Sequence, residues 1–257
     1  MHHFFVDKSN VNDTTIIIDD TDEYNHAVRV LRLKPGEQIL VSDTDGTDYT
    51  CSVAEITEES VRLTVTEVAE NNHELPSKVT LFQCIPKSDK LELIIQKAVE
   101  LGVSDIVPVM SKNCVVKLDD RKQASKTKRW QLIAENAAKQ SKRSIIPTVH
   151  EPVSFRTAVE LCEQADVSII PYEHEDGIVG TCEAIVSFIP GNSIGVMIGP
   201  EGGFDPLEVA MANRHGIRSI SLGKRILRAE TAAIAVLSLI MIRLEIAEGM
   251  NLDAEEE

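Results

Sequence analysis

Residues 199–203 read Gly-Pro-Glu-Gly-Gly and have the composition of a ligand-binding turn. They follow an apolar, strand-like run at 193–199, and a helical pattern begins at 206. The glycines allow positive φ angles and let a ligand come close to backbone N–H groups, so the turn can bind a polar or anionic group. A tight strand-to-helix turn without a ligand explains these five residues equally well.

The glycine pattern argues against two common classes of nucleotide-binding protein. No Gly-Lys-Ser/Thr follows residue 203, and none of the 13 glycines forms Gly-x-Gly-x-x-Gly. The sequence therefore lacks the fingerprints of a phosphate-binding P-loop and of ordinary dinucleotide binding.

Residues 222–232 form a second segment that is dense in reactive groups. Arg225, Arg228, Glu230 and Thr231 surround an expected helix start directly after an apolar strand at 217–222. Between the two arginines, an Ile-Leu pair can form an apolar wall for a flat ring. A capped helix with a solvated arginine and glutamate is the structural alternative. It explains the carboxylate and the hydroxyl, but not why this loop follows a strand end beside the glycine-rich one.

The elements that position these loops belong to an expected parallel sheet at residues 73–257. Strand-like runs alternate with helical patterns, the strands being expected at 79–85, 105–110, 167–172, 193–199 and 217–222. Such alternation is typical of an α/β domain. Ligands of parallel sheets bind beyond the carboxyl ends of the strands, so the loops at 171–173, 199–203 and 222–225 should form one site.

Residues 1–72 are expected to form a separate small β-barrel. Alternating apolar residues at 49–53 and 61–65 follow an Asp-Gly turn signal at 45–46, which is typical of antiparallel strands. A polar stretch at 71–77 without periodicity is the expected linker.

The composition is that of a folded protein with an aliphatic core. Of its 257 residues, 43% are hydrophobic, 26% charged and 4% aromatic. No apolar run reaches the roughly 20 residues of a membrane span, and the N-terminus lacks a signal peptide, so we expect a cytoplasmic protein. The five cysteines and seven histidines show no metal-ligand spacing, so no metal site is expected.

The charge is distributed unevenly. The formal net charge is −15, yet residues 112–146 hold ten Lys/Arg against three Asp/Glu. This concentration fits a surface for a polyanion such as RNA, and a solvated basic helix is the alternative. Expected phosphate contacts are Lys139, Lys142 and Arg143, together with Arg29 and Arg32 in the acidic N-terminal part. Local ion pairs with Asp22 or Glu23 compete for the last two. Helical spacing predicts that Trp130 is a core residue.

The two late motifs together resemble those of the SPOUT, or α/β-knot, methyltransferases. The similarity is greatest to the branch that methylates N3 of a uridine in bacterial 16S ribosomal RNA, and it extends over nearly the whole chain. Further matches are Lys87, Glu92, Gln96, Lys97, Glu100, Leu101, Gly102, Pro108, Arg129, Trp130, Ala138, Gln140, Ser141, Arg143 and Pro147, with His26, Val30, Leu31, Arg32 and Gly36 near the start. The family often has arginine where this chain has His3.

The resemblance implies an N-terminal PUA-like barrel that helps to bind RNA and a C-terminal knotted domain that binds S-adenosylmethionine in a bent pose. It also implies a homodimer that acts on the assembled small ribosomal subunit. The expected cofactor-binding residues are Pro171, Tyr172, Glu173, Gly199, Pro200, Glu201, Gly202, Leu222, Gly223, Ile226, Leu227 and Arg228.

Methylation of uracil N3 sets a chemical requirement that two of these residues can meet. The nitrogen is a good nucleophile only as its proton leaves, which calls for a base or for cations that stabilise the developing negative charge. Glu201 is the candidate base, or else it holds the loop or the cofactor, and Arg228 is the candidate stabiliser. Alternatives are a related methyltransferase acting on a tRNA base or a ribose 2′-hydroxyl, or a non-catalytic RNA-binding assembly factor.

Overall fold

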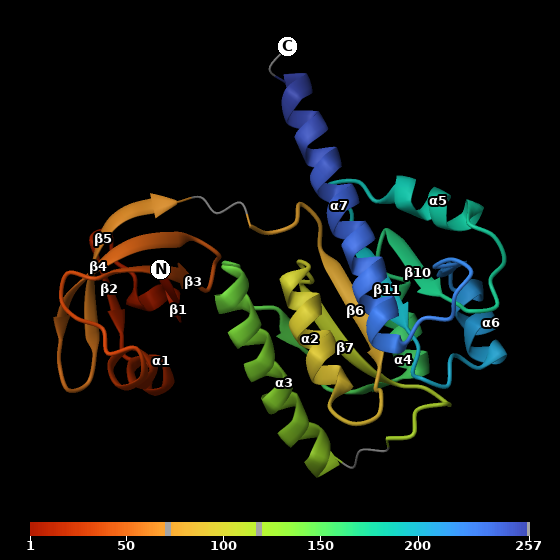
Figure 1. Cartoon of the computed structure of the whole chain (residues 1–257), viewed down its shortest axis with the longest axis horizontal. Coiled ribbons are helices and arrows are strands. Elements are labelled where there is room, and N and C mark those ends of the chain that lie inside the picture. Colours follow the sequence, from red (N-terminus) through yellow and green to blue (C-terminus); the bar gives the residue numbers. More distant parts are fainter. Residues whose placement is uncertain (70–72, 117–119, 256–257) are drawn as a thin grey trace. The chain divides into compact units, whose positions relative to one another are not determined.

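The structure is a computed structural model that describes residues 1–69, 73–116 and 120–255 (Figure 1). It divides into two compact units, one formed by Met1–Glu74 with Ala138–Ile146 and the other by Leu75–Ala137 with Pro147–Glu257. The sequence pattern predicts domains at 1–72 and 73–257. The structure differs because the segment at 138–146 returns to the first unit. Residues 70–72, at the expected boundary, lie outside the described part.

The second unit contains a seven-stranded sheet in which every described strand pair is parallel. The strand order is β12-β10-β11-β6-β7-β8, with β9 paired to β7. The strands are β6 (Val79–Cys84), β7 (Asp105–Met110), β8 (Thr148–Val149), β9 (Val153–Ser154), β10 (Val167–Pro171), β11 (Ile194–Ile198) and β12 (Arg218–Ile220). Because β12, β10 and β11 are neighbours, their carboxyl ends bring the three expected loops to one edge. The parallel α/β prediction is confirmed, whereas the knotted chain path stays a prediction.

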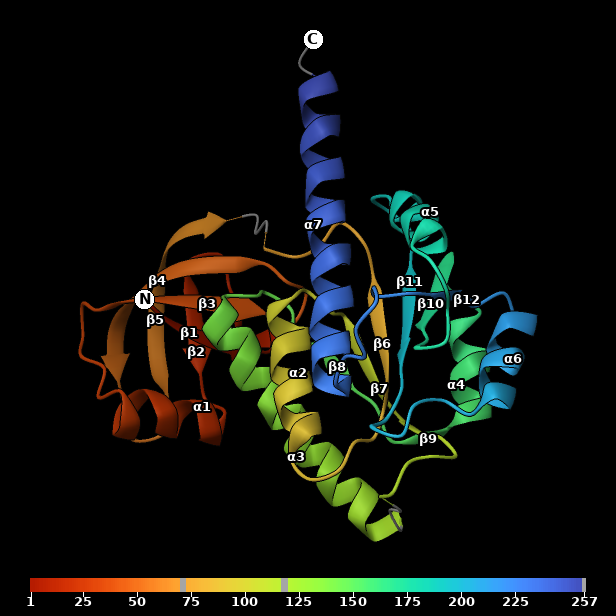
Figure 2. The same ribbon diagram turned by 45° about the vertical axis from the view of Figure 1, so that its right-hand side comes forward.

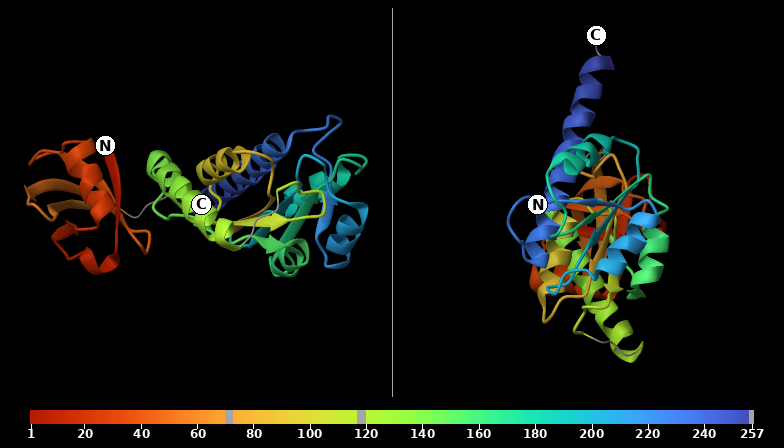
Figure 3. Two further views of the ribbon diagram at one scale, coloured as in Figure 1. Left: turned by 90° about the horizontal axis from the view of Figure 1, so that it is seen from below. Right: turned by 90° about the vertical axis from the view of Figure 1, so that its right-hand side faces the viewer.

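Helices cover both faces of this sheet (Figure 3). On one face, α2 (Lys90–Glu100) and α7 (Ala229–Glu255) run side by side (Figure 2). On the other, α4 (Phe155–Cys162) and α6 (Pro206–Arg214) bury side chains against the strands in a common core. The remaining helices are α3 (Asp120–Ser141) and α5 (Val179–Ser187). No helix in the described ranges has the length and apolarity needed to cross a bilayer.

The first unit is a curled five-stranded sheet of the PUA-like half-barrel type, with strand order β1-β3-β4-β5-β2. Its strands are β1 (His2–Val6), β2 (Thr15–Ile18), β3 (Gln38–Asp43), β4 (Asp48–Ile56) and β5 (Val61–Ala69). Only β1 and β3 pair in parallel; the other described pairs are antiparallel. Alternating residues such as Phe4, Ile39 and Leu63 are fully buried in its core. The short helix α1 (Thr21–Asn25) continues into a π-helical turn at His26–Val30. A 3-10 turn at Lys8–Asn10 lies between β1 and β2.

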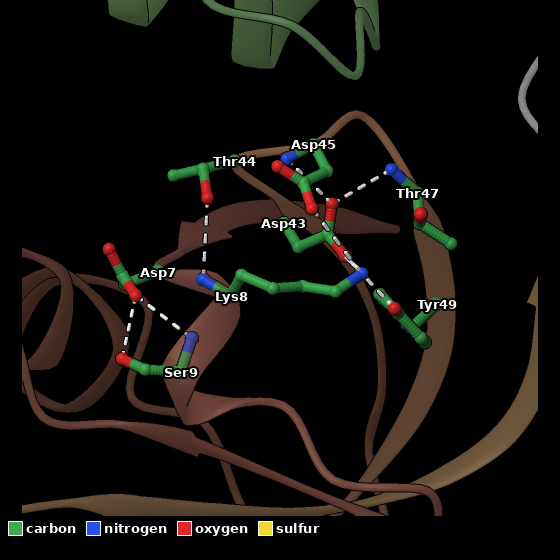
Figure 4. Close-up of polar contacts among 8 residues, drawn as sticks. All are labelled: Asp7, Lys8, Ser9, Asp43, Thr44, Asp45, Thr47 and Tyr49. Atoms are coloured by element: carbon green, nitrogen blue, oxygen red, sulfur yellow. Dashed lines mark hydrogen bonds and ion pairs between the residues drawn. The ribbon is translucent and has the colours of Figure 1, made fainter.

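A buried carboxylate fixes the turn between β3 and β4 (Figure 4). Asp43 accepts hydrogen bonds from the backbone N–H groups of Asp45 and Thr47 at 2.9 Å each, and from the Tyr49 hydroxyl at 3.0 Å. The Lys8 ammonium forms an ion pair with the same carboxylate at 2.5 Å. Burial alone would raise the pKa of Asp43, but these hydrogen bonds and the lysine outweigh it and lower that pKa.

Replacement of Asp43 by alanine should lower the free energy of unfolding by roughly 1–3 kcal/mol, because several buried donors lose their acceptor. A lowered folded-state pKa stabilises the protein above the unfolded pKa. The part of the difference that depends on the charge of Asp43 should therefore be present above pH 3.8, the ordinary pKa of this group, and be lost as the pH falls through the folded-state pKa. Urea unfolding across this pH range measures it. Asp45→Ala, at a side chain that is 68% exposed, is the control and should change stability by less than about 0.5 kcal/mol. A pH-independent difference for Asp43 would contradict this account.

Candidate active site

A cavity of about 390 Å³ opens at the carboxyl ends of β10, β11 and β12. All the predicted cofactor residues except Gly202 line it, and Lys90, Ile198, Gly203, Phe204, Ser221, Lys224, Arg225, Ala229 and Ala232 complete the wall. The three loops expected to form one site, at 171–173, 199–203 and 222–225, all contribute to this wall. The structure thus brings together residues from four segments that lie far apart in the sequence.

Two glycines of this site lie close to side chains of other residues. A Cβ atom on Gly199 would lie 3.2 Å from the Phe204 ring, and one on Gly203, where φ is +66°, would lie 2.1 Å from a carboxylate oxygen of Glu173. At Gly202, which is not part of the cavity wall, a Cβ atom would meet Asn113 at 3.3 Å. The glycine-rich loop is therefore enclosed by side chains from neighbouring loops.

Glu201 is engaged by groups that follow β6. Its carboxylate accepts a hydrogen bond from the Lys87 backbone N–H, at 3.1 and 3.3 Å to its two oxygens, and lies 3.4 Å from the Lys90 Nζ atom. Lys90 also lies 3.4 Å from the Glu230 carboxylate. Burial on its own would raise the pKa of Glu201, but hydrogen bonds from its own backbone and Lys87, with the charge of Lys90, lower that pKa.

The lowered pKa bears on the two roles expected for Glu201, which are to act as the general base or to hold the loop or the cofactor. A general base works best when its pKa lies close to the working pH, and this carboxylate is shifted in the opposite direction. Its partners are Lys87, in the loop after β6, and Lys90, the first residue of α2, so the observed contacts fix the glycine-rich loop against the segment that follows β6. The geometry favours the loop-holding role.

The segment after β7 makes a second set of contacts with the same loop. The Asn113 side-chain amide donates hydrogen bonds to the backbone carbonyls of Gly202 and Gly203, at 3.2 and 3.1 Å. The Lys112 backbone N–H donates to Glu208 at 2.8 Å, and its ammonium pairs with Asp205, the N-cap of α6. Sequence reasoning missed Asn113 and Lys112 as site residues. No local spacing signals them, because their partners lie about 90 residues away in sequence.

Arg228 lies at the cavity wall immediately before α7. Its side chain is exposed and makes no ion pair with any residue in the described ranges, and the same holds for Lys224 and Arg225. Three uncompensated cations thus line one side of the cavity. An anionic group placed there would be stabilised electrostatically.

The expected RNA contacts fall into two groups. Arg29, Arg32 and Lys142 are exposed and have no ion pair within the described part of the chain, so the competing ion pairs with Asp22 or Glu23 are not formed. Lys139 instead pairs with Glu23. Three residues of the basic stretch, 117–119, lie outside the described part.

Arg143 is expected from the sequence to contact RNA phosphates, but the structure buries its side chain. Its side chain is only 3% exposed and forms an ion pair with Glu74, whose carboxylate also accepts N–H bonds from Ser144 and Ile145. A buried guanidinium needs such a partner, so Arg143 stabilises the return of this segment to the first unit. By contrast, the prediction that Trp130 is a core residue is confirmed, since it is 3% exposed.

Comparison with known proteins defines the class. A family model described as an RNA methyltransferase domain matches residues 73–241, and one described as an RNA methyltransferase PUA domain matches residues 18–66. Together with the parallel sheet and the cavity at its edge, these matches identify a SPOUT RNA methyltransferase with a PUA domain.

Individual relatives narrow the class to one family. The chain is 35% identical to ribosomal RNA small subunit methyltransferase E of Bacillus subtilis, over 97% of this chain and 99% of that protein. A structure of the Neisseria gonorrhoeae protein of the same name, bound to S-adenosyl methionine, is 30% identical with a TM-score of 0.82, covering 94% of this chain and 97% of the other. A Legionella pneumophila putative methyltransferase with bound SAM gives the same identity and TM-score, over 93% and 96%. The chain belongs to the ribosomal RNA small subunit methyltransferase E family.

Asn113→Ala should weaken binding of S-adenosylmethionine about five- to tenfold, because loss of both hydrogen bonds leaves the glycine-rich loop less fixed. Isothermal titration calorimetry measures the affinity, and the thermal midpoint reports the fold. The matched control is Lys112→Ala, which removes an ion pair at a side chain that is 63% exposed and keeps the backbone bond to Glu208. Its effect should stay below twofold. Equal losses of affinity in the two variants would contradict the proposal that the Asn113 hydrogen bonds fix the loop for binding.

Proposed function

We propose that this protein transfers a methyl group from S-adenosylmethionine to N3 of a uridine in 16S ribosomal RNA. The observation that carries the proposal is the cavity at the carboxyl ends of β10, β11 and β12 in a chain of this family. The cavity residues fit the cofactor because they combine apolar side chains, glycines that leave the backbone accessible, and the Glu173 carboxylate, which has no ion-pair partner among the described residues. The resemblance and the small-subunit relatives favour this reaction over one on tRNA or on a ribose hydroxyl.

The reaction requires that the protein position the reactants and stabilise developing charge. The bound cofactor supplies an electrophilic methyl group, and the protein must place N3 in line with it. As the N3 proton leaves to solvent water, negative charge spreads over O2 and O4 of the base, and N3 then takes the methyl group while the neutral thioether product remains. Arg228 stays charged at neutral pH and lies at the cavity wall without a protein partner among the described residues, so it can stabilise that charge.

Arg228→Ala should leave a folded protein that binds S-adenosylmethionine but methylates small subunits about a hundredfold more slowly, with donor and RNA saturating. Raising the pH should restore part of the rate, because a larger fraction of the base then loses its proton without help. Single-turnover methylation with a radiolabelled methyl group measures it.

Arg225→Ala is the matched control for Arg228, since it removes the same charge from the same wall. An equal loss in both variants would show that Arg228 contributes only the general positive charge of this wall and has no specific position in the reaction. A near-parental rate for Arg228→Ala would exclude it from the chemistry.

We also propose that two copies of the chain pair through α5 and α7. Leu239, Ile242 and Ile246 are 39–50% exposed and follow helical spacing on one face of α7. On α5, Val179 and Val186 are 70% and 68% exposed. The two helices contact each other within the second unit, and each leaves apolar side chains exposed. A surface of this kind is typical of a subunit interface.

Ile242→Glu should convert a dimer into a monomer, because it buries a charge in an apolar interface. Size-exclusion chromatography with light scattering measures the mass, which we expect to be twice that of one chain for the parent. Leu207→Glu on α6, at a side chain that is 75% exposed, is the control and should remain dimeric. A monomeric parent would contradict the proposal directly.

The RNA partner we propose is the 16S rRNA of the assembled small subunit, in the cytoplasm. Arg29, Arg32 and Lys142 support it, because exposed cations without a carboxylate partner in the described part are suited to phosphate groups. Arg143 and Lys139 are not among the proposed contacts, because each forms an ion pair with a carboxylate of the protein.

A further inference from the structure

Glu173 follows β10 and places its carboxylate at the wall of the cavity. The carboxylate lies so close to the backbone of Gly203 that a Cβ atom there would be 2.1 Å from one oxygen and 3.3 Å from the other. Only glycine leaves room for it, and the positive φ of Gly203 also favours glycine. The glycine-rich loop therefore accommodates this carboxylate as well as opening its backbone.

The Glu173 carboxylate has no direct polar partner in the described part of the chain. Glu173 forms no ion pair or hydrogen bond through its carboxylate with any described residue, and it is exposed to the cavity. Glu201, the other carboxylate at the wall, differs because Lys87 and Lys90 engage it. An unpaired anion beside a ligand cavity attracts a positively charged part of that ligand.

The methyl donor and its product differ in just such a charge. S-adenosylmethionine carries a positive sulfonium, whereas S-adenosylhomocysteine has a neutral thioether and is otherwise the same molecule without the methyl group. Both keep the ammonium, the carboxylate and the ribose. A carboxylate near the sulfur would favour the donor and leave the product almost unaffected.

We propose that Glu173 is a specificity-determining residue that makes the site prefer the charged methyl donor over its neutral demethylated product. The proposal rests on the proposed function, because it assigns a role within that same donor site. Its consequence is directional: the attraction ends when the methyl group leaves, since the positive charge on sulfur disappears with it. Release of the product is thereby helped by the reaction itself.

Calorimetric titration of the full chain with each compound separately tests this. Glu173→Gln keeps the size of the side chain and removes its charge, so we expect affinity for S-adenosylmethionine to fall about tenfold and affinity for S-adenosylhomocysteine to change by less than twofold. The difference in affinity for S-adenosylmethionine between the parent and Glu173→Gln should shrink as salt is added to both proteins, because ions screen the attraction. Glu175→Gln is the matched control, since Glu175 is exposed on the same loop but does not line the cavity. It should change neither affinity.

Equal losses for both compounds would overturn the proposal, because Glu173 would then recognise a group that they share, such as the ribose hydroxyls or the ammonium. No loss for either would also overturn it. A parent protein that binds neither compound would instead overturn the proposed function, and this proposal with it. The thermal midpoint of Glu173→Gln, which we expect to match that of the parent, separates loss of fold from loss of charge.

Discussion

The site depends on how the loop at 199–203 is held while its backbone stays open to the cavity. A loop that leaves its N–H and C=O groups for a ligand cannot use all of them to stabilise itself. Here the stabilising groups come from outside the loop. Glu201 reaches Lys87 and Lys90 after β6, and Asn113 after β7 reaches the carbonyls of Gly202 and Gly203. Both sets of partners follow strands of the same parallel sheet, so the sheet itself sets the loop position.

In the proposed mechanism, the residues that hold the glycine-rich loop differ from those that act on the donor and on the base. With a lowered pKa and a lysine partner, Glu201 is suited to stay ionised and hold its loop. Among the described residues of the cavity wall, Glu173 after β10 and Arg228, with Lys224 and Arg225 after β12, have no ion-pair partner. A positive donor and a base that becomes negative need opposite charges near them. The distribution of unpaired groups provides both within one cavity.

The sequence predicted those features that depend on local pattern. Apolar runs followed by glycines identified the strands and the loops at their ends, and the parallel order then placed the loops together. Features that depend on distant partners were not predictable in the same way. Arg143 lies within a basic stretch, yet its environment is determined by Glu74, 69 residues earlier. Asn113 has an ordinary local context, and its role comes from carbonyls about 90 residues later.

The most direct test of this account is the single-turnover methylation rate of Glu201→Gln, measured with saturating S-adenosylmethionine and small subunits, beside the affinity for the donor. Glutamine keeps an acceptor for the Lys87 N–H but loses the ion pair with Lys90. The account predicts weaker donor binding and a rate within about threefold of the parent, with the same pH dependence. Loss of a general base typically lowers the rate by a factor of 10² to 10⁴. A loss of that size at saturation would contradict the account and make Glu201 the base.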